Sequence, residues 1–263
     1  MMLICLFSIA MSFASLWIRK TAWLWGSFLI IAIITAFKAH VISYLALFPL
    51  AALFICQYAL MYNVNKTVRF LLFCTATLIS LALLFHFLPG FYPIKPYAPF
   101  DTPFIGIFVL ALSIPLISSR VALRKMLRIS LPILIVALIL LNGIALKMGV
   151  IHFDLKLPLN TPAWLGANLF LITIPEEAFF RGFIQREAYI WFGKTPLAAC
   201  GAIFIGSIFF VLVHLAWVGS FPFLCLIFIA SLLYGSLYQW TGTIESSIFC
   251  HFLFNVTHFL LFT

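Results

Sequence analysis

Two adjacent carboxylates inside an apolar segment are the feature of this chain that most clearly suggests chemistry. The chain has only six Asp and Glu residues, and Glu176 and Glu177 lie side by side in the segment LFLITIPEEAFFRGFIQ. A charge at the depth of a bilayer costs about 2.5–3.5 kcal/mol on insertion scales and marks a functional site by default. A carboxylate in such a place is a candidate general base.

Helical geometry separates the roles of the two glutamates. Glu177 and Arg181 are four residues apart, so on a helix they share a face and can form an ion pair. Glu176 points about 100° away around the same helix, so it lies on a different side and can face a cavity. We therefore expect Glu176 to be the base and Glu177 with Arg181 to support it. The alternative is that all three form one buried ion-pair cluster that holds helices together.

Two further apolar runs carry polar residues that suit amide hydrolysis. The run 197–217 contains His214 and no acidic or other basic residue. Phe210 lies one helical turn earlier, where its ring can line a pocket around His214. The last run contains His251 and Asn255, again four residues apart. Both side chains can donate hydrogen bonds to a developing oxyanion. The alternatives are a packing role for His214 and interhelical hydrogen bonding for the other two.

The elements that must position these residues are membrane helices. Hydrophobic residues make up 65% of the chain and charged residues 8%, against roughly 25% charged residues in soluble domains. A bilayer admits only helices or closed barrels, and the runs are continuous rather than alternating. We therefore predict an all-α, polytopic transmembrane helix bundle of about eight to ten spanning helices. The apolar runs are 2–18, 21–37, 41–62, 67–88, 104–118 (short enough to be re-entrant), 129–148, 163–192, 197–217, 221–240 and 244–262.

A Pro-rich stretch divides the chain in sequence. Residues 89–103 read PGFYPIKPYAPFDTP, which cannot be helical throughout. We assign residues 1–128 to N-terminal transmembrane helices of unknown role and residues 129–263 to the part that carries the polar motifs. No long polar stretch interrupts the apolar runs, so no soluble domain is expected.

Charge and cysteine content exclude several classes of protein. The net charge is +9, but the Lys and Arg residues lie in short clusters between apolar runs, which is typical of cytoplasmic loops and not of a nucleic-acid-binding surface. The six cysteines lie inside apolar runs and form no C-x-x-C. They are interpreted as packing residues, not as a disulfide framework or a zinc ribbon.

Taken together, the polar motifs resemble the signature of a known family. Each motif lies in an apolar run, and their order is Glu176-Glu177-x-x-x-Arg181, Phe210-x-x-x-His214 and His251-x-x-x-Asn255. This order resembles the CPBP family of CAAX proteases and bacteriocin-processing enzymes, also called Abi proteins. Gly182 after the arginine and the approach Tyr238-x-x-Thr241-Gly242 look similar to the family too. The resemblance covers roughly residues 129–263.

The resemblance implies an intramembrane endopeptidase. In the family, the first Glu and the His of the second motif activate a water, which assigns that role to Glu176 and His214. The third motif forms an oxyanion hole, which assigns His251 and Asn255. Supporting roles fall to Glu177, Arg181 and Phe210.

The substrate that the resemblance implies is a membrane-associated protein or peptide. The CAAX branch cleaves prenylated C-terminal tripeptides, and bacterial members process peptides, signal-like anchors or sorting tails. We expect a multi-pass protein of a bacterial inner membrane, with the lipid bilayer as its surroundings and no nucleic-acid partner. One departure is Glu245, an acid where the family pattern suggests an apolar or small residue. It is either a substrate contact or a residue at the start of a helix.

The same residues leave a zinc mechanism open as the alternative. Zinc favours two histidines with a carboxylate and an open position, and Glu176, His214 and His251 would have to supply it from three helices. However, H-E-x-x-H is absent, and His251 and His258 stand about 10.5 Å apart along a helix, too far to share one ion. Asn255 suits an oxyanion donor better than a metal ligand. We therefore predict a glutamate mechanism without metal or other cofactor.

Two other classes of protein are weighed against the protease. A non-catalytic membrane scaffold or maturation partner on the same fold would have no need to keep Glu176, His214, His251 and Asn255 together. A transporter would show inverted repeats and helices broken by Gly or Pro in matching halves, and the sequence shows neither. The substrate, the cleavage site and the oligomeric state are not encoded in any motif of the chain.

Overall fold

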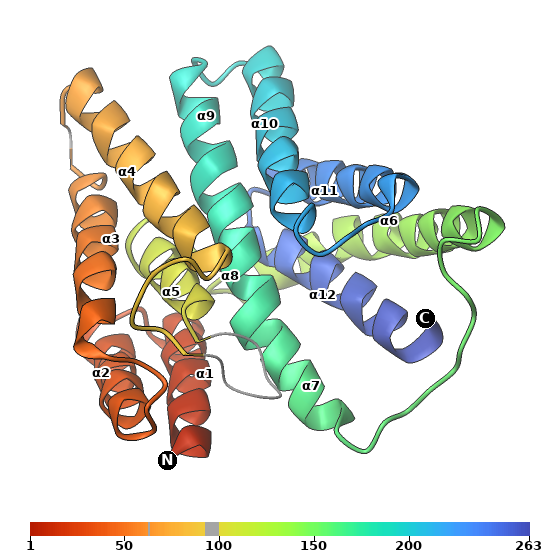
Figure 1. The fold of residues 1–263 in the computed structure, drawn as a ribbon. Helices are drawn as coiled ribbons and strands as arrows, with labels where there is room; N and C mark the ends of the chain where they lie inside the picture. The colour runs from red at the N-terminus through yellow and green to blue at the C-terminus, as the bar shows by residue number, and fades with distance from the viewer. Residues whose placement is uncertain (63, 93–99) are drawn as a thin grey trace. The chain divides into compact units, whose positions relative to one another are not determined.

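A computed structural model describes residues 1–62, 64–92 and 100–263 of the chain. Over these residues the chain is helical and contains no strand, only the isolated bridges Ile42–Phe91 and Phe153–Phe262. The prediction of an all-α fold is therefore confirmed (Figure 1). Residues 93–99 of the Pro-rich stretch lie outside the described part.

Each predicted apolar run contains a helix. Five helices are long and apolar enough to cross a membrane: α4 (Lys66–Leu84), α6 (Arg120–Lys147), α10 (Pro196–His214), α11 (Phe221–Thr241) and α12 (Ile244–Leu261). The shorter apolar helical segments are α1 (Met2–Ile18), α2 (Ala22–Lys38), η1 with α3 (Tyr44–Ala59) and α5 (Thr102–Leu112). The chain is thus an integral, multi-pass membrane protein.

Helix α6 begins earlier than its apolar run suggests. It starts at Arg120 rather than near residue 129, because Ser119 caps it by accepting a hydrogen bond from the Ala122 amide at 3.1 Å. The basic residues of its first turns are good helix formers. Its 28 residues correspond to about 42 Å at 1.5 Å per residue, which exceeds the roughly 30 Å hydrocarbon thickness. The basic turns therefore extend the helix beyond its apolar part.

The chain forms two compact units, and the first comprises residues 1–116 and 166–182. At its centre lies α5, which packs against α1, α3, α4 and α8 (Ile174–Glu177). Every residue from Thr102 to Leu110 is buried, as expected for a helix that is apolar on all sides. Asp101 caps α5 by accepting a hydrogen bond from the Thr102 amide at 2.9 Å.

One continuous helical stretch carries the two glutamates. It runs through α7 (Thr161–Ala167), η2 (Asn168–Thr173), α8, η3 (Ala178–Gln185) and α9 (Arg186–Trp191). Segments η2 and η3 are π-helical, whereas the apolar run predicts an ordinary α-helix. Pro175 lies between them and has no amide hydrogen for a helical bond, which disturbs the regular pattern locally. Short π-helical segments inside α-helices occur frequently at functional sites.

The second unit comprises residues 117–165 and 183–263. Helix α11 packs against α10, α12 and α6, and it ends at Gly242, whose φ of 69° is the left-handed conformation that favours glycine. Gln185 donates a hydrogen bond to the Gly235 carbonyl at 2.9 Å, which ties η3 to α11. Backbone hydrogen bonds join the segment 152–156 to Leu260 and Leu261 at the end of α12 and to Thr263 after it.

Candidate active site

The first motif forms a buried ion pair in the first unit. Arg181 Nε lies 3.1 Å from Glu177 Oε2, and both side chains are 0% exposed. An ion pair in such surroundings is stable only because each charge neutralises the other. Glu176, the adjacent residue, is half-buried. The two neighbouring carboxylates therefore differ in environment, and the fully buried one is joined to the arginine.

Two glycines let α5 approach this motif closely. A Cβ atom on Gly106 would lie 2.9 Å from the Cα of Pro175, a distance that real Cβ atoms essentially never show. A Cβ on Gly182 would lie 3.2 Å from Ile114 Cγ1 and 3.3 Å from Val109 Cγ1. Gly182, the residue after the arginine of the motif, therefore packs tightly against the side chains of Val109 in α5 and Ile114 just after it.

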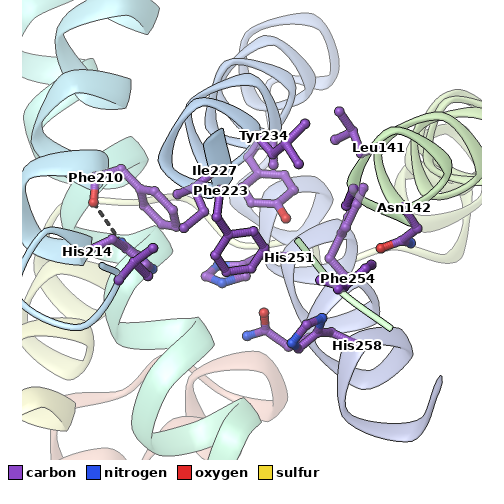
Figure 2. Close-up of a pocket in the computed structure, with 16 residues that line it drawn as sticks. Leu141, Asn142, Phe210, His214, Phe223, Ile227, Tyr234, His251, Phe254 and His258 are labelled. Carbon is purple, nitrogen blue, oxygen red and sulfur yellow. Dashed lines mark hydrogen bonds between the residues drawn. The ribbon is translucent and has the colours of Figure 1, made fainter. Parts of the chain in front are cut away.

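The second unit contains a cavity of about 250 Å³ lined by side chains from α6, α10, α11 and α12. Its polar lining includes His214 from α10 together with His251 and Asn255 from α12. Most of the other lining side chains are aliphatic or aromatic. Figure 2 shows the labelled histidines and aromatic rings around this space. A few polar groups in an apolar cavity are typical of a binding or catalytic site.

The imidazole of His214 is held in one tautomer. Its Nδ1 lies 2.7 Å from the carbonyl oxygen of Phe210 (Figure 2), and a carbonyl oxygen can only accept a hydrogen bond. The contact therefore requires the proton on Nδ1, which leaves Nε2 of the neutral ring as the basic nitrogen. The ring of Phe210 also stacks on His214 with centroids 4.4 Å apart. Phe210 thus orients His214 in two ways, through its carbonyl oxygen and through its ring.

Aromatic rings fix His251 as well. The ring of Tyr234, from α11, stacks on His251 with centroids 5.1 Å apart and planes 14° apart. Phe210 meets the same imidazole edge-on at 5.5 Å. Ser247, one turn before His251, donates a hydrogen bond to the Tyr234 carbonyl at 2.8 Å. His251 is 4% exposed and lines the cavity, so its orientation is set by α10 and α11 together.

Three polar residues of the cavity lining were not predicted from the sequence as parts of a site: Asn142, Tyr234 and His258. Asn142 and Tyr234 come from apolar runs in which single polar residues normally serve packing. His258 shares the spacing signal of the third motif, since it follows His251 by seven residues and Asn255 by three. This spacing places His251, Asn255 and His258 on one helix face. It is the sequence signal from which His258 could have been predicted as a cavity residue.

Glu245 has a structural partner in the second unit. Its Oε1 accepts a hydrogen bond from the Ile117 backbone amide at 2.7 Å. Glu245 lies in the first turn of α12, where a negative charge also interacts favourably with the helix dipole. This contact joins the segment before α6 to the start of α12, so the acid that departs from the family pattern has a role in folding.

The residues of the predicted site are thus found in two places. His214, His251, Asn255 and the supporting Phe210 line one cavity of the second unit. Glu176, Glu177 and Arg181 belong to the first unit, and their meeting with the histidines stays a prediction. No group of three or more His, Cys, Asp or Glu side chains is clustered as metal ligands would be within the residues that the structure describes.

Comparison with known proteins bears on the region that contains all three motifs. Residues 158–257 match the family model described as type II CAAX prenyl endopeptidase Rce1-like. No curated protein and no solved structure matches the chain. The family consists of membrane proteases, and its match confirms the CAAX-protease resemblance of the motifs. Residues 158–257 of this multi-pass membrane protein are therefore similar to the Rce1-like family of type II CAAX prenyl endopeptidases.

Proposed function

We propose that the chain is a glutamate-type intramembrane endopeptidase that hydrolyses a peptide bond of a membrane-associated protein or peptide. Glu176 and His214 activate a water molecule, and His251 with Asn255 forms the oxyanion hole. Glu177, Arg181 and Phe210 hold these groups in place. The compartment that we propose is a bacterial inner membrane.

The observation that carries the proposal is the cavity of the second unit. His214 presents Nε2 as a hydrogen-bond acceptor for a water molecule, because its Nδ1 proton is directed at the Phe210 carbonyl. His251 and Asn255 line the same space from one face of α12, and each can donate a hydrogen bond. An acceptor that orients the attacking water and donors for the oxyanion, around one apolar cavity, are among the groups that amide hydrolysis requires.

The proposed reaction needs one water and one peptide bond. The Glu176 carboxylate takes a proton from the water while His214 Nε2 accepts a hydrogen bond from it, and the water oxygen attacks the carbonyl carbon. The negative charge that develops on the carbonyl oxygen is stabilised by the N–H groups of His251 and Asn255. The C–N bond then breaks, and the proton on Glu176 passes to the leaving nitrogen. The products are a carboxylic acid and an amine, which ionise to a carboxylate and an ammonium group.

The test is cleavage of membrane-inserted reporter peptides by the purified chain in lipid nanodiscs, with products identified by mass spectrometry. We expect cleavage by the wild type and a loss of about 10²–10⁴-fold in Glu176→Gln, the contribution typical of a general base. Asn255→Ala should lose about 10²–10³-fold, as for a removed oxyanion donor.

Asp154→Asn is the matched control. The Asp154 side chain is 50% exposed, and the proposed mechanism does not use it, so this variant should keep wild-type activity. Wild-type cleavage by folded Glu176→Gln would contradict the assignment of the base. If no reporter is cleaved by a folded, membrane-inserted chain, the non-catalytic scaffold becomes the better explanation.

A further inference from the structure

Helix α6 begins with a cluster of basic side chains. Four of them are exposed in its first turns: Arg120, Arg124, Lys125 and Arg128. Residues 102–153 contain no Asp or Glu, and the carboxylate of Glu245, near the start of α6, accepts a hydrogen bond from the Ile117 amide. Positive charges at a helix N-terminus oppose the helix dipole, and like charges three or four residues apart repel each other. The cluster therefore weakens the isolated helix, and an anionic partner would offset that effect.

An apolar groove lies between α6 and α11 within the second unit. The two helices pack against each other (Figure 1), and the groove has a volume of about 420 Å³. Its lining is apolar and includes Pro132, Val136 and Leu140 from α6 with Ile229 and Leu233 from α11. Val136 is 55% exposed and Leu140 57%. The groove therefore opens on the surface of the protein.

Two of the basic side chains lie on the same side of α6 as this groove. At 100° per residue, Lys125 is about 20° from Val136 around the helix, and Arg128 is about 80° from it. Arg124 is about 120° from Val136 and Arg120 about 160°. One half of the basic cluster is therefore directed toward the groove side of the helix, and the other half is turned away from it.

The groove has about the length of one lipid leaflet. Residues 129–146 carry no charge and correspond to about 27 Å of helix, close to the roughly 30 Å hydrocarbon thickness of a bilayer. Arg128 therefore lies at the level of the lipid headgroups. From Pro132 to Leu141, the lining extends for about 13.5 Å along α6, against about 15 Å for half of the hydrocarbon thickness. An acyl chain that begins beside Arg128 would match the groove in length.

We propose that this groove binds an acyl chain of an anionic phospholipid, whose phosphate is held by Lys125 and Arg128. Both types of side chain bind phosphate, and their long apolar stems let the charged groups reach the headgroup level. A zwitterionic lipid carries a positive group of its own and complements the two cations less well. A second copy of this chain, with a net charge of +9, would bring more positive charge to them. The anionic lipid therefore matches both the groove and the charge.

The bound lipid lies against the outside of a wall of the candidate active site. Leu141 lines both the groove and the cavity that contains His214 and His251, so the acyl chain packs on a side chain that shapes the cavity. The inference does not depend on the proposed proteolysis, because neither Lys125 nor Arg128 takes part in the reaction.

The test is lipid binding by the full chain in a non-ionic detergent, measured by native mass spectrometry. The probes are dioleoyl phosphatidylglycerol and dioleoyl phosphatidylcholine, which share their acyl chains and differ in net charge. We expect one phosphatidylglycerol per chain, bound about thirtyfold more tightly than phosphatidylcholine, the effect of two basic side chains on an anionic headgroup. Inorganic phosphate should not displace the lipid, because it has no acyl chain to fill the groove.

Three variants separate a lipid site from a general attraction of basic turns to anionic lipid. Lys125→Gln/Arg128→Gln should bind the two lipids equally. Arg120→Gln/Arg124→Gln is the matched control, because it removes two charges from the same turns on the side away from the groove, and it should keep a preference of about tenfold or more. Ala137→Phe adds a ring at a residue that lines the groove, so it should weaken the binding of both lipids.

Several results would overturn the proposal. Equal Kd values of the two lipids on the wild type, or no binding of either, would exclude an anionic lipid site. Displacement by inorganic phosphate would indicate an anion site that does not use the groove, and an equal loss of preference in both double variants would indicate diffuse attraction. A dimer that Ala137→Phe abolishes would assign the groove to a second copy of the chain. The comparison of lipids on the wild type decides the matter even if a variant does not fold.

Discussion

Removing the carboxylate of Glu177 should unfold the first unit rather than simply slow a reaction. In Glu177→Gln, the guanidinium of Arg181 loses the Glu177 carboxylate while it stays fully buried, because both side chains are 0% exposed. The amide is nearly the same size as the carboxylate, so packing changes little. The effect of the substitution is therefore electrostatic, and it isolates the cost of removing one carboxylate from a buried ion pair.

The magnitude follows from the burial of the pair. Breaking a buried ion pair by removing one partner costs about 3–5 kcal/mol, because the other charge is left uncompensated. An exposed pair would cost only about 0.2–1 kcal/mol. Since native proteins are stable by about 5–15 kcal/mol, Glu177→Gln should lose a large share of the stability. Glu177→Leu/Arg181→Met, which removes both charges, should recover most of it.

The assay is equilibrium unfolding in mixed micelles, with Glu176→Gln as the matched control. That variant changes the neighbouring, half-buried glutamate in the same way, and it should keep a stability within about 1 kcal/mol of the wild type, in the usual range for a mild substitution. If Glu177→Gln is as stable as Glu176→Gln, the pair is not the buried, mutually dependent unit that its geometry indicates.

Three other outcomes follow from the same contacts. Tyr234→Leu should lower kcat by removing the ring that stacks on His251, while Tyr234→Phe, which keeps the ring, should restore it; equal kcat values in folded variants would contradict a positioning role. Gly106→Ala should destabilise the protein by about 1–3 kcal/mol through overpacking, whereas Gly143→Ala, with nothing within 4 Å of the added Cβ, should stabilise it by up to about 1 kcal/mol. Elemental analysis of an active preparation should find less than stoichiometric zinc; about one zinc per chain, with activity lost on chelation and restored by zinc alone, would establish the metalloprotease mechanism.

The helices were predictable because apolar length is a direct signal in a membrane protein. Every apolar run contains a helix, and errors occur where charge or length is ambiguous. The basic residues from Arg120 to Arg128 are typical of a loop in the sequence. In the structure they form the first turns of α6, which Ser119 caps. The short run at 104–118 becomes α5, an 11-residue helix. Its nearly complete burial depends on neighbours far away in sequence.

The local part of the candidate site was also predictable. Spacing alone suggested the pair of Glu177 with Arg181, since four residues bring side chains to one face of a helix. The π-helical turns on either side of α8 were not foreseen, because hydrophobic periodicity does not distinguish them from an α-helix. The sequence motifs do not reveal the aromatic support of His214 and His251, which depends on the packing of α10, α11 and α12.

The central claim is that Glu176 and His214 act on the same water, and the distance between them tests it most directly. The measurement is an experimental structure of the full chain in a lipid nanodisc. We predict that Glu176 lies within hydrogen-bond reach of His214 or one bridging water away, with His251 and Asn255 facing the same cavity. Catalytic contacts of this kind are about 2.6–3.2 Å, directly or through one water. A separation of His251 from Glu176 of more than about 10 Å, far beyond such contacts, would leave no shared site and contradict the account.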